Sequence, residues 1–149
     1  MENIRRATVN DAPRIAEIEV FNYRLNFYPI FKNDYYYFDE LQVSSKTESY
    51  LNAPHLLGKI YVYDDGVIKG FISVCGEEVE KLFVEPILQG NSIGAKLLEY
   101  AIESFDVKYL WALEKNVRAI RFYERYGFVV TSDRKYEEGT TEYLVRLER

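Results

Sequence analysis

The chain has 149 residues, 48% of them hydrophobic and 29% charged, which predicts one folded domain over residues 1–149 and excludes a disordered chain. The formal net charge of -5 and the pI of about 5.0 exclude the basic surface that nucleic-acid binding needs. The start of the sequence lacks the apolar segment of a signal peptide, and no stretch reaches the ~20 apolar residues that span a bilayer. We therefore expect a cytoplasmic protein.

Cysteine and histidine each occur once, as Cys75 and His55. A single cysteine excludes an internal disulfide and a cysteine-based metal site, and a single histidine excludes a multi-histidine metal site. Serine-histidine-aspartate catalysis would need His55, and no G-x-S-x-G sequence accompanies it. We interpret Cys75 as a core residue and His55 as a loop residue, and we expect no metal site.

The first part of the chain predicts a strand followed by a helix. Residues 4–9 are typical of a strand. Asn10 or Asp11 can cap a helix, and Pro13 is tolerated in the first turn of that helix. Apolar residues then recur at helical spacing, as Ile15, Ile18, Phe21 and Leu25.

A proline and an aromatic segment follow that helix. Pro29 is expected to end or kink it, and residues 31–38 are expected to be irregular. A polar helix is predicted over residues 40–52 and stops near Pro54.

The middle of the chain predicts three antiparallel strands. Residues 59–65 and 67–75 flank the turn sequence Asp64-Asp65-Gly66, which is a strong hairpin signal. Gly76 then turns the chain into a third strand over residues 78–86.

The last part alternates helices and strands. One helix face is marked by Ile93, Leu97, Ala101, Ile102 and Phe105. A short buried strand follows at residues 109–113, and Asn116 caps another helix that ends near Gly127. Residues 128–137 and 141–149 predict a closing hairpin. This order of elements predicts an α/β (α+β) fold, a mixed sheet with helices on its faces.

The loop between the third strand and the next helix has the character of an anion site. Successive backbone N–H groups from Gly90 to Ala95 would converge where the helix begins, and Gln89 and Lys96 could add donors. The sequence fits neither a P-loop nor the G-x-G-x-x-G dinucleotide fingerprint. From the loop alone, a plain helix start with a packing glycine remains equally open.

Two motifs together resemble the GNAT superfamily, the GCN5-related N-acetyltransferases. The pattern N-x-x-A-x-x-F-Y-x-x-x-G-F is matched by Asn116, Ala119, Phe122, Tyr123, Gly127 and Phe128. The family's acetyl-CoA signature Q/R-x-x-G-x-G/A is similar to Gln89-Gly90-Asn91-Ser92-Ile93-Gly94. The likeness covers nearly the whole chain and is clearest over residues 58–130. It implies a mostly antiparallel sheet of about seven strands and about four helices, splayed at the cofactor site.

One position departs from the family pattern. Ser92 stands where the signature has its central glycine, whose missing Cβ lets backbone approach a ligand closely. A serine hydroxyl can itself donate to a phosphate, so we interpret Ser92 as a tolerated variant that bears on cofactor affinity.

The resemblance implies acetyl-CoA as co-substrate and assigns its binding residues. The pantetheine arm would pair with the backbone of Leu82, Phe83 and Val84, and Asn116 would contact the arm, cap its helix, or do both. The pyrophosphate would lie on the amides of the loop residues Gln89, Gly90, Asn91, Ser92, Ile93, Gly94 and Ala95.

The resemblance also implies how a proton reaches the leaving group. Tyr123 matches the family's tyrosine that protonates the departing coenzyme A thiolate; the alternative is a tyrosine packed in the core. A phenol with a pKa near 10 can protonate a thiolate whose acid has a pKa near 8.5. Glu78 and Glu80 alternate with Val79 and Lys81, which places both carboxylates on one face of the strand before the loop. Either carboxylate can act as the base that takes the amine proton, directly or through water, or no dedicated base exists.

The acceptor is expected to be a primary amine, either a small molecule or a protein lysine or N-terminus. The resemblance places the aromatic segment 21–38 over the acceptor, and we expect Tyr36 to line that pocket while most of the other rings pack the core. Direct attack in a ternary complex needs no covalent enzyme intermediate. The alternative is a non-catalytic domain that binds acyl-CoA as a sensor. A monomer or a homodimer paired through the closing hairpin is expected.

Overall fold

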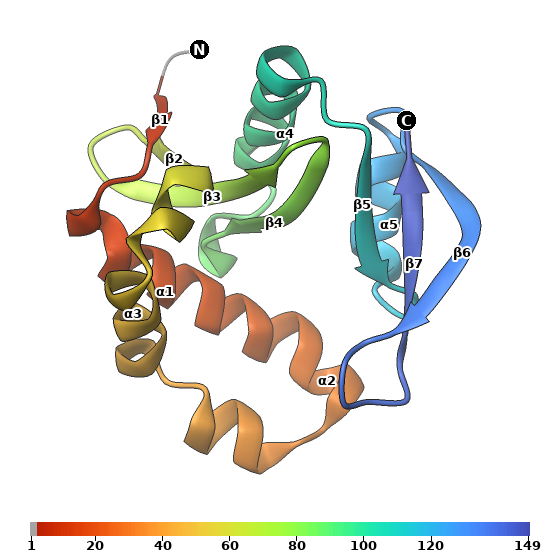
Figure 1. Cartoon of the computed structure of the whole chain (residues 1–149), viewed down its shortest axis with the longest axis horizontal. Helices are drawn as coiled ribbons and strands as arrows, with labels where there is room; N and C mark the ends of the chain where they lie inside the picture. The colour runs from red at the N-terminus through yellow and green to blue at the C-terminus, as the bar shows by residue number, and fades with distance from the viewer. Residues whose placement is uncertain (1–2) are drawn as a thin grey trace.

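In the computed structural model, which describes residues 3–149, seven strands form one sheet (Figure 1). The strands are β1 (Ile4–Arg6), β2 (Ile60–Asp64), β3 (Ile68–Cys75), β4 (Glu78–Val84), β5 (Tyr109–Leu113), β6 (Val129–Tyr136) and β7 (Tyr143–Glu148). Their order in the sheet is β1-β2-β3-β4-β5-β7-β6. Every neighbouring pair is antiparallel except β4 and β5, which run parallel. The predicted mixed, mostly antiparallel sheet is confirmed.

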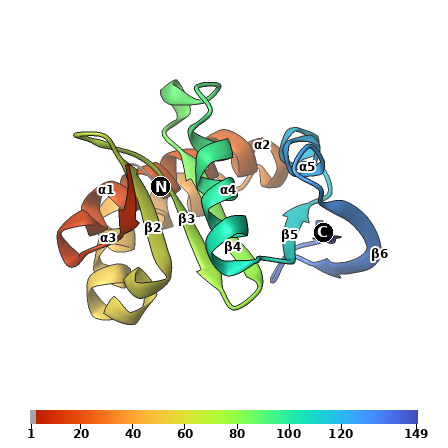
Figure 2. The ribbon, with the colours of Figure 1, turned by 90° about the horizontal axis from the view of Figure 1, so that it is seen from above.

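Five α-helices cover the two faces of the sheet. They are α1 (Ala12–Asn22), α2 (Tyr28–Phe31), α3 (Val43–Asn52), α4 (Ile93–Phe105) and α5 (Val117–Glu124). Helices α1 and α3 pack together on one face, while α4 and α5 lie on the other (Figure 2). Each face buries its own hydrophobic core, one centred on Ile15 and Phe71 and one on Leu97 and Leu110.

The N-terminal strand is shorter than the sequence predicts. Strand β1 ends at Arg6, and a 3-10 turn at Val9–Asp11 replaces the expected end of the strand. Asp11 accepts hydrogen bonds from the Thr8 backbone N–H at 2.7 Å and from the Arg5 guanidinium at 2.8 Å. These bonds turn the chain out of the sheet and into α1.

The segment after α1 is more helical than the sequence predicts. A π-helical turn (Tyr23–Phe27) joins α1 to α2, so Pro29 neither ends the helix nor interrupts a regular α-helical hydrogen bond. A wide turn accommodates proline because proline has no N–H to donate. Lys32 ends α2 in the left-handed conformation, with φ of 54°. The segment expected to be irregular contains a second π-helical turn (Tyr36–Glu40), and α3 begins only at Val43.

The decisive feature of the sheet is the separation of β4 from β5. Only two residue pairs join them, Glu78 with Tyr109 and Val79 with Leu110. Beyond these pairs the two strands diverge (Figure 1). The edge of β4 from Leu82 to Val84 therefore faces an opening instead of a neighbouring strand, as the splayed fold predicts.

Three further predictions concern the closing hairpin, Cys75 and membrane-spanning helices. Strands β6 and β7 form the predicted closing hairpin, and β6 is an edge of the sheet. Cys75 is exposed at the end of β3, so its interpretation as a core residue is wrong. Within residues 3–149, the helices are too short or too polar to cross a membrane.

Candidate active site

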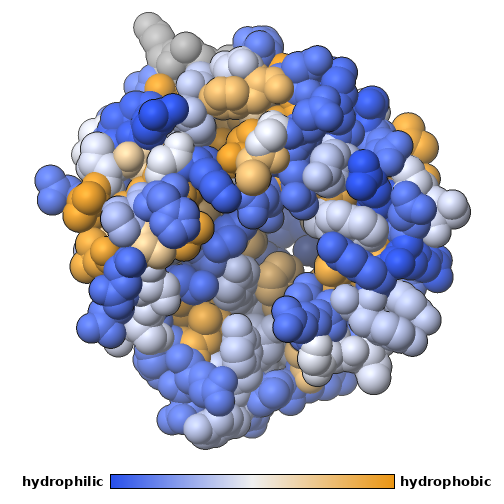
Figure 3. Space-filling model, viewed as in Figure 1, coloured by the Kyte–Doolittle hydropathy of each residue, from blue (hydrophilic) through white to orange (hydrophobic). Residues whose placement is uncertain are grey.

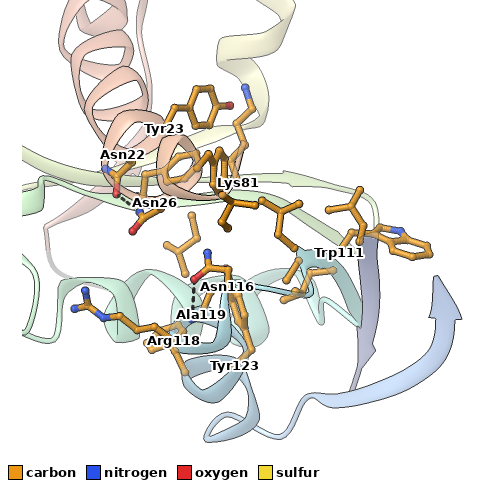
Figure 4. A pocket seen from close by; sticks show the side chains of 18 of the residues that line it. Asn22, Tyr23, Asn26, Lys81, Trp111, Asn116, Arg118, Ala119 and Tyr123 are labelled. Carbon is orange, nitrogen blue, oxygen red and sulfur yellow. Dashed lines mark hydrogen bonds between the residues drawn. The ribbon is translucent and has the colours of Figure 1, made fainter. Parts of the chain in front are cut away.

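A cavity of about 1250 Å³ opens at the divergence of β4 and β5. Figure 3 shows the molecule hollowed near the middle of one face. The cavity is lined by α1 and its π-helical extension, by β4 and β5, by the start of α4, by α5 and by the β6–β7 loop. Residues of α1 and residues of α5 face it from opposite sides (Figure 4). It therefore has one wall near α4 and α5 and another near α1 and α3.

The start of α4 presents free backbone donors to this cavity. The first hydrogen bond at the start of the helix runs from the Lys96 N–H to the Ser92 carbonyl. Ile93, Gly94 and Ala95 line the cavity, and their backbone N–H groups have no acceptor within residues 3–149. Amides of this kind at a helix N-terminus bind anions. The start of α4 therefore offers the donors that the predicted anion site needs. Lys96 does not line it, since its ammonium lies over the Tyr63 ring.

The backbone conformation of Ser92 shows why the family signature has a glycine at this position. Its φ is 66° and its ψ is 10°, a left-handed conformation that costs a side-chain-bearing residue energy and glycine none. Gly90 nearby also has a positive φ, of 88°. Both residues line the cavity, whereas Asn91 does not, and its side chain instead donates to the Leu88 carbonyl at 2.9 Å.

Gln89 holds the loop in place through its side chain. Its amide donates to the Asn22 side-chain oxygen at 3.1 Å and to the Val84 carbonyl at 3.3 Å. Asn22, which is buried, also donates to the Val84 carbonyl at 2.9 Å. These bonds occupy the Gln89 donors and the Val84 carbonyl. The groups left for a ligand are therefore the loop amides and the outward-facing β4 backbone of Leu82, because the Phe83 backbone is hydrogen-bonded to β3.

Helix α5 brings Asn116 and Tyr123 to the same cavity. The Asn116 side-chain oxygen accepts from the Ala119 N–H at 3.4 Å, which confirms the predicted cap, and Asn116 also lines the cavity. Tyr123 is half-buried against Phe122 and Phe128. Burial raises the pKa of the Tyr123 phenol above its usual value, so this group keeps its proton at neutral pH. Arg118, five residues before Tyr123, adds an exposed positive charge to this wall.

The two candidate bases lie on β4 where it carries a β-bulge. Val74 pairs with Val79 and Ser73 pairs with Lys81, so Glu80 is the extra residue between them. Glu80 lines the cavity and lies 3.8 Å from the Lys59 ammonium. Glu78 does not line the cavity. Its pKa is raised by burial and by the negative charge of Glu80.

The opposite wall contains a buried carboxylate that the sequence interpretation missed. Glu19 is fully buried and lies 2.9 Å from the Lys81 ammonium and 3.3 Å from that of Lys46. The hydroxyls of Tyr23 and Tyr50 both donate to it. Burial raises the pKa of Glu19, but the two ammonium groups and the tyrosine hydrogen bonds together bring it below its usual value. Glu19 is therefore ionised at neutral pH.

Tyr36 also lies on this wall. It lines the cavity beside Tyr37, with ring centroids 4.9 Å apart in an edge-to-face contact. Burial, together with the charges of Glu40, Glu19 and Glu137, raises the pKa of Tyr36. Glu137 belongs to the β6–β7 loop, which also lines the cavity.

Comparison with known proteins identifies this arrangement. The model of a family described as "Acetyltransferase (GNAT) domain" matches residues 57–130, which include β4, its splayed edge, the α4 loop and Tyr123. The chain belongs to the GNAT family of acetyltransferases. The resemblance inferred from the two motifs is confirmed.

Similar proteins share the GNAT domain or its fold. A curated peptidyl-lysine N-acetyltransferase, YjaB from Salmonella typhimurium, is 33% identical over 72 residues, which are 48% of this chain and 50% of that protein. The chain thus spans about half the length of the curated relatives it matches. An N-acetyltransferase structure from Staphylococcus aureus Mu50 superimposes with a TM-score of 0.76 at 17% identity, over 97% of this chain and 98% of the other. A PaiA N-acetyltransferase from Thermoplasma acidophilum, solved with coenzyme A, has a TM-score of 0.70 at 17% identity, over 98% of both chains.

Local sequence signals located only part of this GNAT site. The structure brings together the β4 edge, the α4 amides, Asn116, Tyr123, Glu80 and Tyr36, and it leaves Glu78 and Asn91 outside the cavity lining. Sequence interpretation missed Glu19, Asn22, Lys46 and Lys81. A signal for Glu19 does exist, because it follows Ile15 by four residues and therefore shares the buried face of α1.

Proposed function

We propose that this single GNAT domain is an acetyl-CoA-dependent N-acetyltransferase that moves an acetyl group to a primary amine. The observation that supports this most is the meeting of three features at one cavity. These are the open edge of β4, the free amides at the start of α4, and the protonated phenol of Tyr123. Acetyl-CoA supplies the activated acetyl thioester, and direct attack in a ternary complex requires no covalent intermediate on the protein.

The residues present fit coenzyme A by their chemistry. The free amides of Ile93, Gly94 and Ala95 suit the pyrophosphate, and Arg118 adds positive charge on the same wall. The outward-facing backbone of Leu82 offers the pantetheine amides the pairing that β5 does not provide. The Asn116 side-chain oxygen caps α5, and its NH₂ group has no partner within residues 3–149 and can donate to the same arm.

The proton transfers are assigned to Tyr123 and Glu80. When the amine nitrogen bonds to the acetyl carbon and the carbon–sulfur bond breaks, the sulfur leaves as a thiolate and takes the Tyr123 proton. The amine arrives mainly as an ammonium ion, because its pKa is near 10.4. Glu80 accepts that first proton, directly or through water, because it lines the cavity while Glu78 does not. The second proton that the nitrogen loses as the amide forms returns through water to the phenolate left on Tyr123.

The acceptor class follows from the relatives and from the open mouth of the cavity. The curated relatives carry the name peptidyl-lysine N-acetyltransferase, and we assign a lysine side chain or a similar primary amine as acceptor. Tyr36 and Glu137 at the mouth suit a cationic side chain entering from outside.

A screen of primary amines that follows thiol release tests this function. It should include lysine peptides, free amino acids and polyamines, with acetyl-CoA binding measured in parallel. Turnover of any amine class above the hydrolysis background is expected. Tight binding of acetyl-CoA with no turnover across the screen would instead indicate the alternative function, a non-catalytic acyl-CoA sensor.

A further inference from the structure

The wall of the cavity formed by α1, α3 and β4 carries two lysines around a single carboxylate. Lys46 comes from α3 and Lys81 from β4, and both ammonium groups contact the same Oε2 atom of Glu19. They therefore lie side by side although they come from distant parts of the sequence. Both lysines line the cavity, while Glu19 is buried behind them.

The charges of this cluster do not balance. Glu19 is ionised, so one ammonium would neutralise it, and the second leaves a net positive charge. Within residues 3–149, neither Lys46 nor Lys81 has an ion pair with any other carboxylate. Partly buried charges without a counter-charge are costly, so a surplus of this kind on a cavity wall favours an anionic ligand.

Spare hydrogen-bond donors on the lysines point to the same ligand. Glu19 is saturated by Tyr23, Tyr50 and the two ammonium groups. Lys81 donates to Glu19 and, at 3.3 Å, to the Tyr50 hydroxyl, which leaves one of its three N–H groups free. The side chains of Lys46 and Lys81 are 24% and 31% exposed, so their free donors are accessible from the cavity.

The position of the cluster connects it to the acceptor. In Figure 4 the Lys81 side chain extends toward Tyr23, on the far side of β4 from Asn116 and Tyr123. Lys81 directly follows Glu80, the assigned base, along β4. An anion bound between the two lysines would thus belong to the molecule whose amine reaches Glu80, and not to the phosphates at the start of α4.

We propose that Lys46 and Lys81 form a carboxylate subsite, so that the preferred acceptor carries a carboxylate close to its reactive amine. The proposal rests on the N-acetyltransferase function and names its substrate class. The carboxylate can be the main-chain carboxylate of a free amino acid or the side chain of an acidic residue next to a peptide lysine. Plain polyamines, which lack a carboxylate, are poor acceptors on this basis.

Two matched pairs of acceptors test the subsite and separate these two sources. One pair is lysine and lysinamide, and the other is a peptide blocked at both ends with lysine followed by glutamate or by glutamine. Binding to the coenzyme A-loaded protein is measured by titration calorimetry, and kcat/KM is measured by thiol release. We expect the carboxylate member of at least one pair to bind about tenfold tighter or more, as for a charged hydrogen bond.

The variants Lys46→Met and Lys81→Met show whether the lysines cause the preference. Lys46→Met is the safer of the two, because Lys81 still neutralises Glu19 and the fold should be kept. It should bring the carboxylate preference close to parity and leave coenzyme A affinity unchanged. Lys69→Met is the matched control, since Lys69 also pairs with a carboxylate, at 2.8 Å from Asp65, but does not line the cavity.

The possible outcomes separate the subsite from the proposed function. Equal affinity within both acceptor pairs, or a preference unchanged in both cavity variants, would overturn the subsite even if acetyl groups are transferred. A carboxylate preference that depends on Lys46 would support the subsite even if no acetyl group is transferred, and the missing turnover would then refute the enzyme function alone.

Discussion

Ser92 shows how one departure from a family pattern acts through the backbone. A residue with a Cβ in the left-handed conformation costs roughly 1–2 kcal/mol, and a glycine costs about 0.5–1 kcal/mol in chain entropy. Ser92→Gly should therefore raise the free energy of unfolding by about 0.5–1 kcal/mol, measured by urea denaturation. Gly90→Ala is the opposite control, because Gly90 has a φ of 88° and open space around its missing Cβ. It should destabilise the protein, and a destabilising Ser92→Gly would show that the Ser92 side chain makes a compensating contact.

Tyr123 is the residue on which the chemical step depends. Its phenol is protonated at neutral pH, because the ordinary tyrosine pKa is near 10 and burial raises it further, so Tyr123→Phe removes a proton donor without changing charge. We expect kcat to fall by about 10²- to 10⁴-fold, the usual range for a general acid, with little change in the Kd of acetyl-CoA. Stopped-flow or steady-state thiol release measures the first quantity, and calorimetry measures the second.

Tyr126→Phe is the matched control for that change. Tyr126 lies on the turn after α5, lines the same cavity and contacts Phe122, but it has no assigned role in proton transfer. Its loss should alter kcat by no more than a few-fold. Equal effects of the two substitutions would mean that Tyr123 acts by packing and not as the acid.

Motif residues could be located from the sequence, whereas the residues around Glu19 could not. Asn116 and Tyr123 are fixed by local helix geometry and by the family pattern. The cluster of Glu19, Lys46 and Lys81 joins α1, α3 and β4, and no local pattern records which distant lysine will meet a buried carboxylate. Glu19 itself was identifiable as a charge on an apolar helix face, but its partners depend on the tertiary packing of α3 against α1.

At the scale of elements, a charged capping box fixes the 3-10 turn Val9–Asp11 that leads into α1. Asp11 is buried and accepts two bonds from the Arg5 guanidinium, at 2.8 and 3.1 Å, besides the bond from Thr8. The hydrogen bonds from Arg5 are the main reason that the pKa of Asp11 lies below its usual value, and the Thr8 N–H lowers it further. The ionised carboxylate therefore stabilises the folded chain.

This cap predicts a stability difference that depends on pH. Asp11→Asn should lower the free energy of unfolding by about 1–2 kcal/mol at pH 7. A lowered pKa gives stability that is present above the ordinary aspartate pKa, near 3.9, and lost as the pH falls through the folded-state pKa. The difference between wild type and Asp11→Asn in urea unfolding should thus shrink below about pH 4.

Asp133→Asn serves as the control for the charge change itself. Asp133 is exposed on β6 and has no ion pair within residues 3–149. Its replacement should therefore hardly change the free energy of unfolding at either pH. A difference for Asp11→Asn that stays constant between pH 3 and pH 7 would contradict an ionic cap.

Some elements follow from local sequence, and others do not. The hairpin at Asp64–Gly66, helix α4 and the Asn116 cap are set by turn chemistry and apolar spacing, and their positions match the prediction. The π-helical turns at 23–27 and 36–40 could not be predicted, because their rings contact partners that no local pattern records. Tyr23 and Phe27 pack on Phe83 of β4, and Tyr37 packs on Tyr28 and Phe31 of α2. The early end of β1 depends on Arg5 reaching both Asp11 and Asp64, which is a tertiary contact.

At the scale of the whole molecule, the sheet consists of two blocks that barely touch through hydrogen bonds. Strands β1 to β4 form one antiparallel block, and β5, β7 and β6 form the other. The two pairs between β4 and β5 are the only ladder that joins them in residues 3–149. The number of strands could be read from the sequence, whereas the place of β7 between β5 and β6 depends on long-range pairing that no local pattern records.

A ligand lying between these blocks should bind them together. Acetyl-CoA at 100 times its Kd adds about 2.7 kcal/mol to the stability of a protein that binds it only in the folded state. The melting temperature should therefore rise with acetyl-CoA, while ATP and NAD should not raise it.

Hydrogen exchange locates the effect of acetyl-CoA along the chain. Amides of Leu82 and of residues 93–95 should gain protection, because they lack partners in the free protein. Amides of β2 should not change, because both of its edges are already paired. A rise in melting temperature without protection at β4 and the start of α4 would place acetyl-CoA elsewhere and refute the assigned site.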